Sequence, residues 1–349
     1  MKNLIAISAF ALLFCMAPAA LHAQVTGEEA RVTILKGQIE GFIDAHKARA
    51  LRHGGKLDSK GSVTVEKAGN YYAFTLPHLS FTDAKGVRSE IGMIALNASP
   101  RANGEWSVSL AIPTPIKSFG HGGGEMFRTD IDTQQASGIW NERLGHFSAL
   151  KGDYGNVRLN NLVDQGTVTI GALSIRSQLS PQSGNDFTGK TYITFDNISA
   201  YDAGTAFRAI VPHTAIEGDI KTVAASSPMT REQVRSRPQN ASFPDGYNIV
   251  ASLIGAPEKA QVTVKGLDAV NAQLQQSLIT ATPSHRAKIL QSILAVSTIS
   301  GLGRPVQGDT SAKLYEIVFG ANGSIALNGT DFGTLLQTTN PGGGIPVLR

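Results

Sequence analysis

One stretch of the sequence matches a nucleotide-binding pattern. The segment SGNDFTGKTYITFDN contains Gly184, followed after four positions by Gly189, Lys190 and Thr191, which is the pattern of a phosphate-binding loop. That chemistry needs a helix directly after the lysine, because the free amide groups of a helix N-terminus converge on the phosphates. Here Thr191 leads into Tyr-Ile-Thr-Phe, a β-branched and aromatic run that predicts a strand. We therefore interpret the segment from Gly184 to Gly189 as a hairpin loop and predict that no nucleotide binds.

A second stretch invites an esterase interpretation. The run GHGGGE at 120–125 is similar to the glycine-rich run that supplies oxyanion-hole amides in lipases. That chemistry also needs a serine flanked by glycines in the pattern Gly-x-Ser-x-Gly, and no serine of the chain satisfies it. We predict a turn between strands at this position.

Two acidic residues form the remaining candidate for catalysis. Asp130 and Asp132 are two positions apart in an extended segment, which places both carboxylates on one face of a strand. Such a pair could bind calcium or act as paired acids in hydrolysis, and two solvated carboxylates are the alternative. His46 and His53 could share a helix face, but no HExxH pattern exists. We assign no catalytic, cofactor-binding or metal-binding residue from the sequence.

The N-terminal segment predicts export. A short basic start, MKN, precedes the apolar run Leu4–Met16 and a series of small residues ending at Ala23. This order is typical of a secretory signal peptide, so we predict a signal peptide over 1–23, cleavage after Ala23 and a periplasmic or secreted location. The single cysteine, Cys15, lies in that segment, and we expect no disulfide or thiol chemistry. No later run reaches the roughly 18 apolar residues of a membrane helix, so we expect no span after cleavage.

Composition limits the partners. The chain of 349 residues has a net charge of +4 and is 17% charged, which would suit an anionic partner such as a membrane surface or acidic polymer. The one basic run, Arg231–Arg237, is explained equally by a solvated linker. No basic and aromatic motif supports nucleic-acid binding, and we predict none.

Periodicity indicates how the chain is built. The segment Glu28–Arg52 has apolar residues at three-to-four spacing and predicts an amphipathic helix. Its glycines, Gly37 and Gly41, suggest a close approach of another element. From about Gly61 to Lys221 apolar and polar residues alternate between turn residues, which predicts half-buried antiparallel strands.

Two phrases of this β region look related. The segment Thr75–Gly86 aligns with Thr194–Gly204, and the apolar phase flips at Pro77-His78 and at Asp196-Asn197. A flip within a strand indicates a bulge that adds one residue. Either an internal duplication or a shared strand-and-turn composition explains the likeness.

The C-terminal part is of mixed type. We predict a short strand at 261–264, a helix at 267–280 and a second helix from Pro283 to Gly301. A closing hairpin follows, with its turn at Asn322-Gly323. The predicted organisation is a signal peptide 1–23, an N-terminal helix plus antiparallel β region 24–221, a linker 222–247, a C-terminal α+β part 248–335 and a flexible tail 336–349. The fold class is β-rich α+β, with a long antiparallel sheet that is curved and bulged.

The layout resembles a bacterial envelope family. The phrases YYAFTLPHLSFTDAKG, GLDAV and YEIVFGANGSIALNG, together with the signal peptide, look like the periplasmic family typified by YdgA and the wider group of AsmA-like β-rich envelope proteins. This resemblance implies an envelope role with a lipid or other apolar ligand. Our prediction is a non-catalytic binding or structural protein of the envelope, for a lipid or anionic component, without a cofactor. The alternative is a hydrolase of an envelope glycan or ester that uses Asp130 and Asp132.

Overall fold

The computed structural model of the chain describes residues 27–52, 54–142, 146–181, 187–203, 207–220, 259–319 and 325–331. The predicted signal peptide at 1–23, the linker at 222–247 and the tail at 336–349 lie outside the described residues, as does the predicted turn at Asn322-Gly323.

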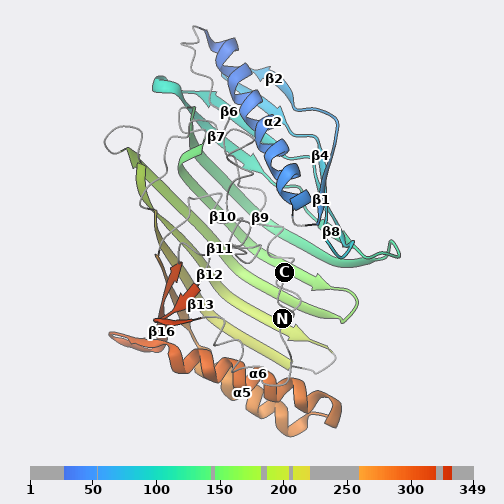
Figure 1. The fold of residues 1–349 in the computed structure, drawn as a ribbon, viewed down its shortest axis with the longest axis vertical. Helices are drawn as coiled ribbons and strands as arrows, with labels where there is room; N and C mark the ends of the chain where they lie inside the picture. The colour runs from blue at the N-terminus through green and yellow to red at the C-terminus, as the bar shows by residue number, and fades with distance from the viewer. Residues whose placement is uncertain are drawn as a thin grey trace.

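Most of the described chain forms one antiparallel sheet (Figure 1). Eight short strands come first: β1 (Lys56–Lys60), β2 (Thr64–Ala68), β3 (Tyr71–Thr75), β4 (His78–Thr82), β5 (Arg88–Gly92), β6 (Ala95–Pro100), β7 (Glu105–Ala111) and β8 (Ile116–Phe119). Five long strands follow: β9 (Glu125–Asn141), β10 (His146–Asn161), β11 (Gly166–Pro181), β12 (Phe187–Asp202) and β13 (Phe207–Ile220). In β7, Trp106, Val108 and Leu110 are buried and the residues between them are exposed, as a period of two requires. The predicted β-rich antiparallel fold is confirmed.

The sheet branches at β9. One edge of β9 pairs with β10, and the other edge pairs with β8 near Glu125 and with β7 near Asn141. Behind β7 the sheet continues through β6 and β3 to β2, and behind β8 it continues through β5 and β4 to β1. From β10 to β13 each strand pairs with the next in the chain. Both branches therefore depend on one strand for their alignment.

Helix α2 (Glu28–Arg52) covers the branched part of the sheet (Figure 1). Its Leu35, Ile39 and Ile43 are buried in the core that both branches share, because residues four apart lie on one helix face. The predicted N-terminal helix is confirmed. The predicted close approach at Gly37 and Gly41 is wrong, since a Cβ atom at either position would meet no atom within 4 Å.

A polar network fixes α2 to the end of β9. Arg31 Nε donates to Glu142 Oε1 at 2.7 Å, and Trp106 Nε1 donates to the same oxygen at 2.6 Å. Gln38 donates to the backbone oxygen of Glu142 at 3.0 Å and accepts from Trp140 Nε1 at 2.9 Å. The tryptophan side chains are 0% and 1% exposed, so their N–H groups depend on these acceptors.

The apolar pattern of the long strands changes phase at one level of the sheet. In β10, Tyr154 and Val157 are both buried although they are three positions apart, and in β11 Ile170 and Leu173 do the same. At this level the pairing skips one residue on each strand, namely Asp132, Asn156, Gly171, Asn197 and Pro212. We call these five positions the phase-change row.

Two of the five positions in the phase-change row are asparagines with a left-handed backbone. Asn156 has φ 49° and Asn197 has φ 54°, a conformation that asparagine tolerates better than most residues. The flip predicted at Asp196-Asn197 is confirmed, because Phe195 and Ile198 both pack against the core. It needs no added residue here, and register shifts occur elsewhere, between Leu79/Ser80 and Phe147/Ala149. The flip predicted at Pro77-His78 falls between β3 and β4, which pair with different strands.

The C-terminal part extends the same sheet. Its elements are β14 (Lys259–Lys265), α5 (Leu267–Thr280), α6 (Pro283–Leu302), β15 (Arg304–Val306), β16 (Asp309–Phe319), β17 (Ile325–Leu327) and β18 (Thr330–Asp331). β14 pairs with β13 on one edge and β16 on the other, and β16 pairs with β17. The predicted strand and two helices are confirmed, and β16 and β17 pair antiparallel as the strands of the predicted hairpin should. Among the described residues, no helix has both the length and the apolar character that crossing a membrane demands.

Candidate functional site

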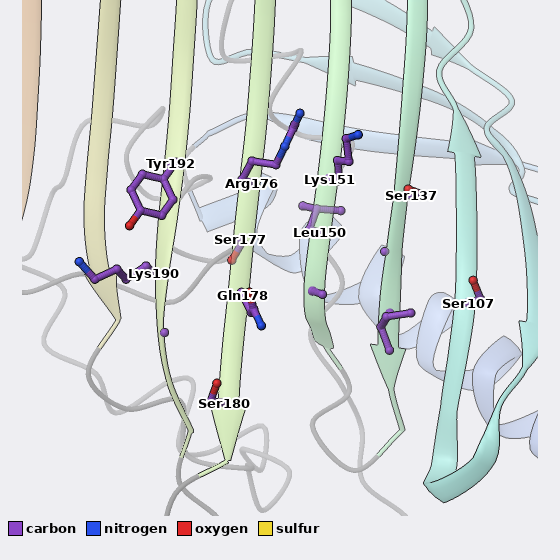
Figure 2. Close-up of a pocket in the computed structure, with 14 residues that line it drawn as sticks. Ser107, Ser137, Leu150, Lys151, Arg176, Ser177, Gln178, Ser180, Lys190 and Tyr192 are labelled. Carbon is purple, nitrogen blue, oxygen red and sulfur yellow. The ribbon is translucent and has the colours of Figure 1, made fainter.

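An open cavity of about 760 Å³ lies against the long strands, near the end of the sheet at which β9 and β11 finish (Figure 2). Side chains and backbone of β7, β9, β10, β11 and β12 line it. The described lining residues are Ser107, Ser137, Gly138, Ile139, Ala149, Leu150, Lys151, Arg176, Ser177, Gln178, Ser180, Gly189, Lys190 and Tyr192. The volume is within the range of small-molecule sites in proteins.

The cavity is on the face of the sheet opposite α2. Trp140 points toward the helix, since its Nε1 donates to Gln38. Side chains alternate along a strand, so Ser137 and Ile139 of β9 point the other way. Figure 2 agrees, because the helix lies behind the strands and the labelled side chains of Lys151 and Arg176 lie in front. Residues paired across neighbouring strands point to the same side of the sheet. The pairing runs from Ile139 through Ala149 and Gln178 to Lys190, so all four face the cavity side.

Three cations border the cavity. Lys151, Arg176 and Lys190 are all substantially exposed, so a ligand in the cavity can reach them. The Lys151 Nζ lies 3.5 Å from Asp153 Oδ2, and Arg176 Nη2 donates to Asp153 Oδ1 at 2.6 Å. Lys190 Nζ donates to Glu217 Oε1 at 2.8 Å. These carboxylates hold the cations in place.

Asp153 is ionised at neutral pH. Burial by itself would raise the pKa of this carboxyl, but hydrogen bonds from Arg176 and Ser174 and the charges of Arg176 and Lys151 outweigh burial and lower the pKa below its ordinary value. Arg176 also donates to the backbone oxygens of Gly152 and Ile175, at 3.0 and 2.8 Å. The guanidinium is therefore positioned before any ligand arrives.

The rest of the lining is of mixed character. Ser137, Gln178 and Ser180 supply neutral hydrogen-bonding groups, while Ile139 and the exposed ring of Tyr192 supply apolar surface. No His, Cys, Asp or Glu is among the described lining residues. A site with fixed cations, hydroxyl groups and an aromatic ring can bind an anion attached to an apolar group.

The phosphate-loop pattern ends inside a strand. Lys190 and Thr191 belong to β12 and pair with Gln178 and Ser177 of β11, so the predicted strand after Lys190 is confirmed. The first part of the loop predicted at Gly184–Gly189 lies outside the described residues, but Phe187, Thr188 and Gly189 belong to β12 and pair with β11, so this part of the loop prediction is wrong. Lys190 therefore borders the cavity from a strand.

The fold itself requires Gly189. A Cβ atom here would collide with the backbone oxygen of Gln178 and lie 2.8 Å from Leu179 Cδ2. We expect Gly189→Ala to destabilise the protein by about 1–3 kcal/mol, because the strands must separate. Gly122→Ala is the matched control, since a Cβ there meets nothing within 4 Å. Urea unfolding of both variants measures the difference, and equal midpoints would show that β11 and β12 are not this close.

The run at 120–125 is a turn between β8 and β9, as predicted. Gly120 N donates to the backbone oxygen of Gly124 at 3.0 Å, and Gly123 N donates to that of Gly120 at 2.9 Å. Two of its amide groups are thus used within the turn.

The two aspartates share the outward face of β9, as predicted. Thr129, which precedes Asp130, and Ile131, which lies between Asp130 and Asp132, are both buried. Arg158 binds Asp132 through two hydrogen bonds of 2.7 and 2.5 Å, and these lower the pKa of Asp132. A carboxyl of this kind stays ionised and is unsuited to donate a proton as a general acid. Asp130 accepts from Asn160 Nδ2 at 3.3 Å.

The histidines are dispersed. His46 stacks on Phe42 with ring centroids 4.2 Å apart, and His53 lies outside the described residues. His213 Nδ1 lies 2.5 Å from Asp196 Oδ1 on neighbouring strands. Within the described part of the chain, no group of three or more His, Cys, Asp or Glu side chains could hold a metal ion.

Sequence reasoning missed Lys151 and Arg176. Each is a single cation in a different strand, and only the register of β10 with β11 places them opposite each other. The one signal in the sequence was that each cation occupies a polar, solvent-facing position in the alternating pattern of its strand.

Comparison of the chain with protein-family models and with curated proteins finds no match.

Proposed function

We propose that the protein is exported and binds an anionic amphiphile of the cell envelope in the cavity on β7 and β9–β12. Export is supported by the signal-peptide pattern at 1–23. The observation that carries the binding proposal is the grouping of Lys151, Arg176 and Lys190 around one cavity with an exposed tyrosine.

The charges favour an acidic head group. Arg176 can present two N–H groups in one plane, which suits a phosphate or carboxylate. The lysines on either side add donors that can follow a head group of different shapes. Ile139 and Tyr192 then offer surface to the attached hydrocarbon, so the whole ligand is an amphiphile and not a simple salt.

The native ligand can be tested directly. Protein purified from the envelope of its own host should yield an acidic amphiphile in organic extracts analysed by mass spectrometry. The amphiphile should be absent from extracts of a Lys151→Ala/Lys190→Ala variant. A wild-type extract without any such compound would argue for a purely structural role.

A defined probe tests the charge requirement. Dodecyl phosphate should bind the wild-type protein more tightly than the neutral dodecyl maltoside in isothermal titration calorimetry. Lys151→Ala/Lys190→Ala should lower the affinity for dodecyl phosphate about tenfold, because each exposed charge contact contributes up to about 1 kcal/mol. Lys56→Ala/Lys117→Ala removes two comparable exposed lysines of β1 and β8 and should leave binding unchanged. Equal loss in both variants would reject the cavity as the site.

A further inference from the structure

The two C-terminal helices form a layer of their own at the far end of the sheet (Figure 1). α5 packs on β13, and α6 packs on α5. Val270, Leu274, Ile289 and Ala209 make a small core that is separate from the main one. Only two residues connect the helices, and such a short connection makes them antiparallel.

The outside of this helix pair is also apolar. Ile279 is 78% exposed, Leu290 is 52% exposed and Leu294 is 45% exposed. The inner side of α6 already carries Ile289 and Ile293. A helix that is apolar on both sides normally has a second surface to contact.

Three of the exposed apolar residues, Ile279, Leu290 and Leu294, lie on one side of the pair, whereas Ile299, which is 44% exposed, lies on another side of α6. Each of the three follows an inward-facing residue by one position: Leu278, Ile289 and Ile293 face the small core. One residue is about 100° of rotation in an α-helix. Because the helices run in opposite directions with their inner faces together, this rotation brings Ile279, Leu290 and Leu294 to the same side. We call this surface the hairpin face.

Beyond Asp268, the charged residues of the two helices have one sign. Between Ala269 and Leu302 the sequence contains Arg286 and Lys288 and no acidic residue. Arg286 is exposed at the start of α6, beside the end of α5 that carries Ile279. The nearest acid in sequence, Asp268, lies at the opposite end of α5, where Ser300 donates to it at 2.8 Å. Exposed apolar residues on helices whose remaining charged residues are basic suit a surface that is apolar and negatively charged.

We infer that the hairpin face docks on an anionic lipid surface. Ile279, Leu290 and Leu294 enter the boundary between head groups and acyl chains, and Arg286 contacts the lipid phosphates. The inference does not depend on the cavity, which lies on other strands.

Vesicle flotation tests this docking. The full-length exported protein should float with vesicles of phosphatidylglycerol and phosphatidylcholine in equal parts, and much less with phosphatidylcholine alone. Leu290→Ser/Leu294→Ser should lower the partition coefficient at least tenfold, because each leucine loses its transfer from water to the bilayer. Arg286→Ala should weaken binding to the anionic vesicles only.

Matched variants separate docking from other effects. Met93→Ser/Leu162→Ser removes two apolar residues that are similarly exposed elsewhere and should float like the wild type. Lys151→Ala/Lys190→Ala should also float normally, so failure of the cavity proposal leaves this one standing. Three results would overturn it: wild-type protein that does not float, loss of flotation with the cavity variant, or unchanged flotation of the leucine variant.

Discussion

Trp140→Ala is expected to destabilise the protein by about 3–5 kcal/mol, the range measured for removal of a buried aromatic ring. The side chain is 1% exposed, and its ring lies 5.2 Å from that of Phe147 in an edge-to-face arrangement. Truncation also leaves the amide oxygen of Gln38, which accepts from Trp140, without its donor. Urea unfolding monitored by circular dichroism measures the change.

Trp140→Phe separates the two contributions. Phenylalanine keeps most of the ring but removes the N–H group, and we expect a loss of about 1–3 kcal/mol from the unpaired oxygen of Gln38. A phenylalanine variant as unstable as the alanine variant would mean that the hydrogen bond, and not the packing, dominates. An alanine variant of near wild-type stability would contradict the position of α2 on the sheet.

Glu142→Ala should cost about 2–4 kcal/mol, although the residue lies at the end of a strand, where most substitutions are mild. One carboxylate oxygen accepts from both Arg31 and Trp106. Its removal leaves a fully buried indole N–H without an acceptor and a guanidinium without its ion-pair partner. Thermal unfolding should show the loss as a lower Tm.

A double-mutant cycle checks this explanation. If Arg31 and Glu142 act together, Arg31→Ala combined with Glu142→Ala should cost less than the sum of the two single changes. Glu142→Gln, which keeps one acceptor oxygen, should fall between wild type and Glu142→Ala. Additive single changes would show that Arg31 and Glu142 stabilise the protein independently.

Local signals in the sequence predicted most of the elements. The three-to-four spacing around Leu35 and Ile39 gave α2, and the alternation at Trp106 and Val108 gave β7. Both signals are local, because burial of one face imposes a period on consecutive residues. Even the strand after Lys190 could be predicted against a complete motif match, since β-branched residues followed it.

The branching of the sheet and the cavity could not be predicted in this way. β9 is one uninterrupted strand, and nothing in its own residues states that β7 and β8 share its edge. The cavity residues Lys151, Arg176 and Lys190 come from three strands and meet through register alone. Register depends on how distant segments pair, and a single sequence carries little information on that pairing.

The phase-change row has a consequence for folding. A strand of simple alternation can slide by two residues along its neighbour and still keep every side chain on the correct face. Here a slide of that size would move the left-handed Asn156 or Asn197 opposite a residue of regular strand conformation. The backbone pairing on both sides of that asparagine would then be lost. Mispaired states are therefore destabilised at every strand pair from β9 to β13. The long sheet has one favoured register, which a uniformly alternating sequence would not specify.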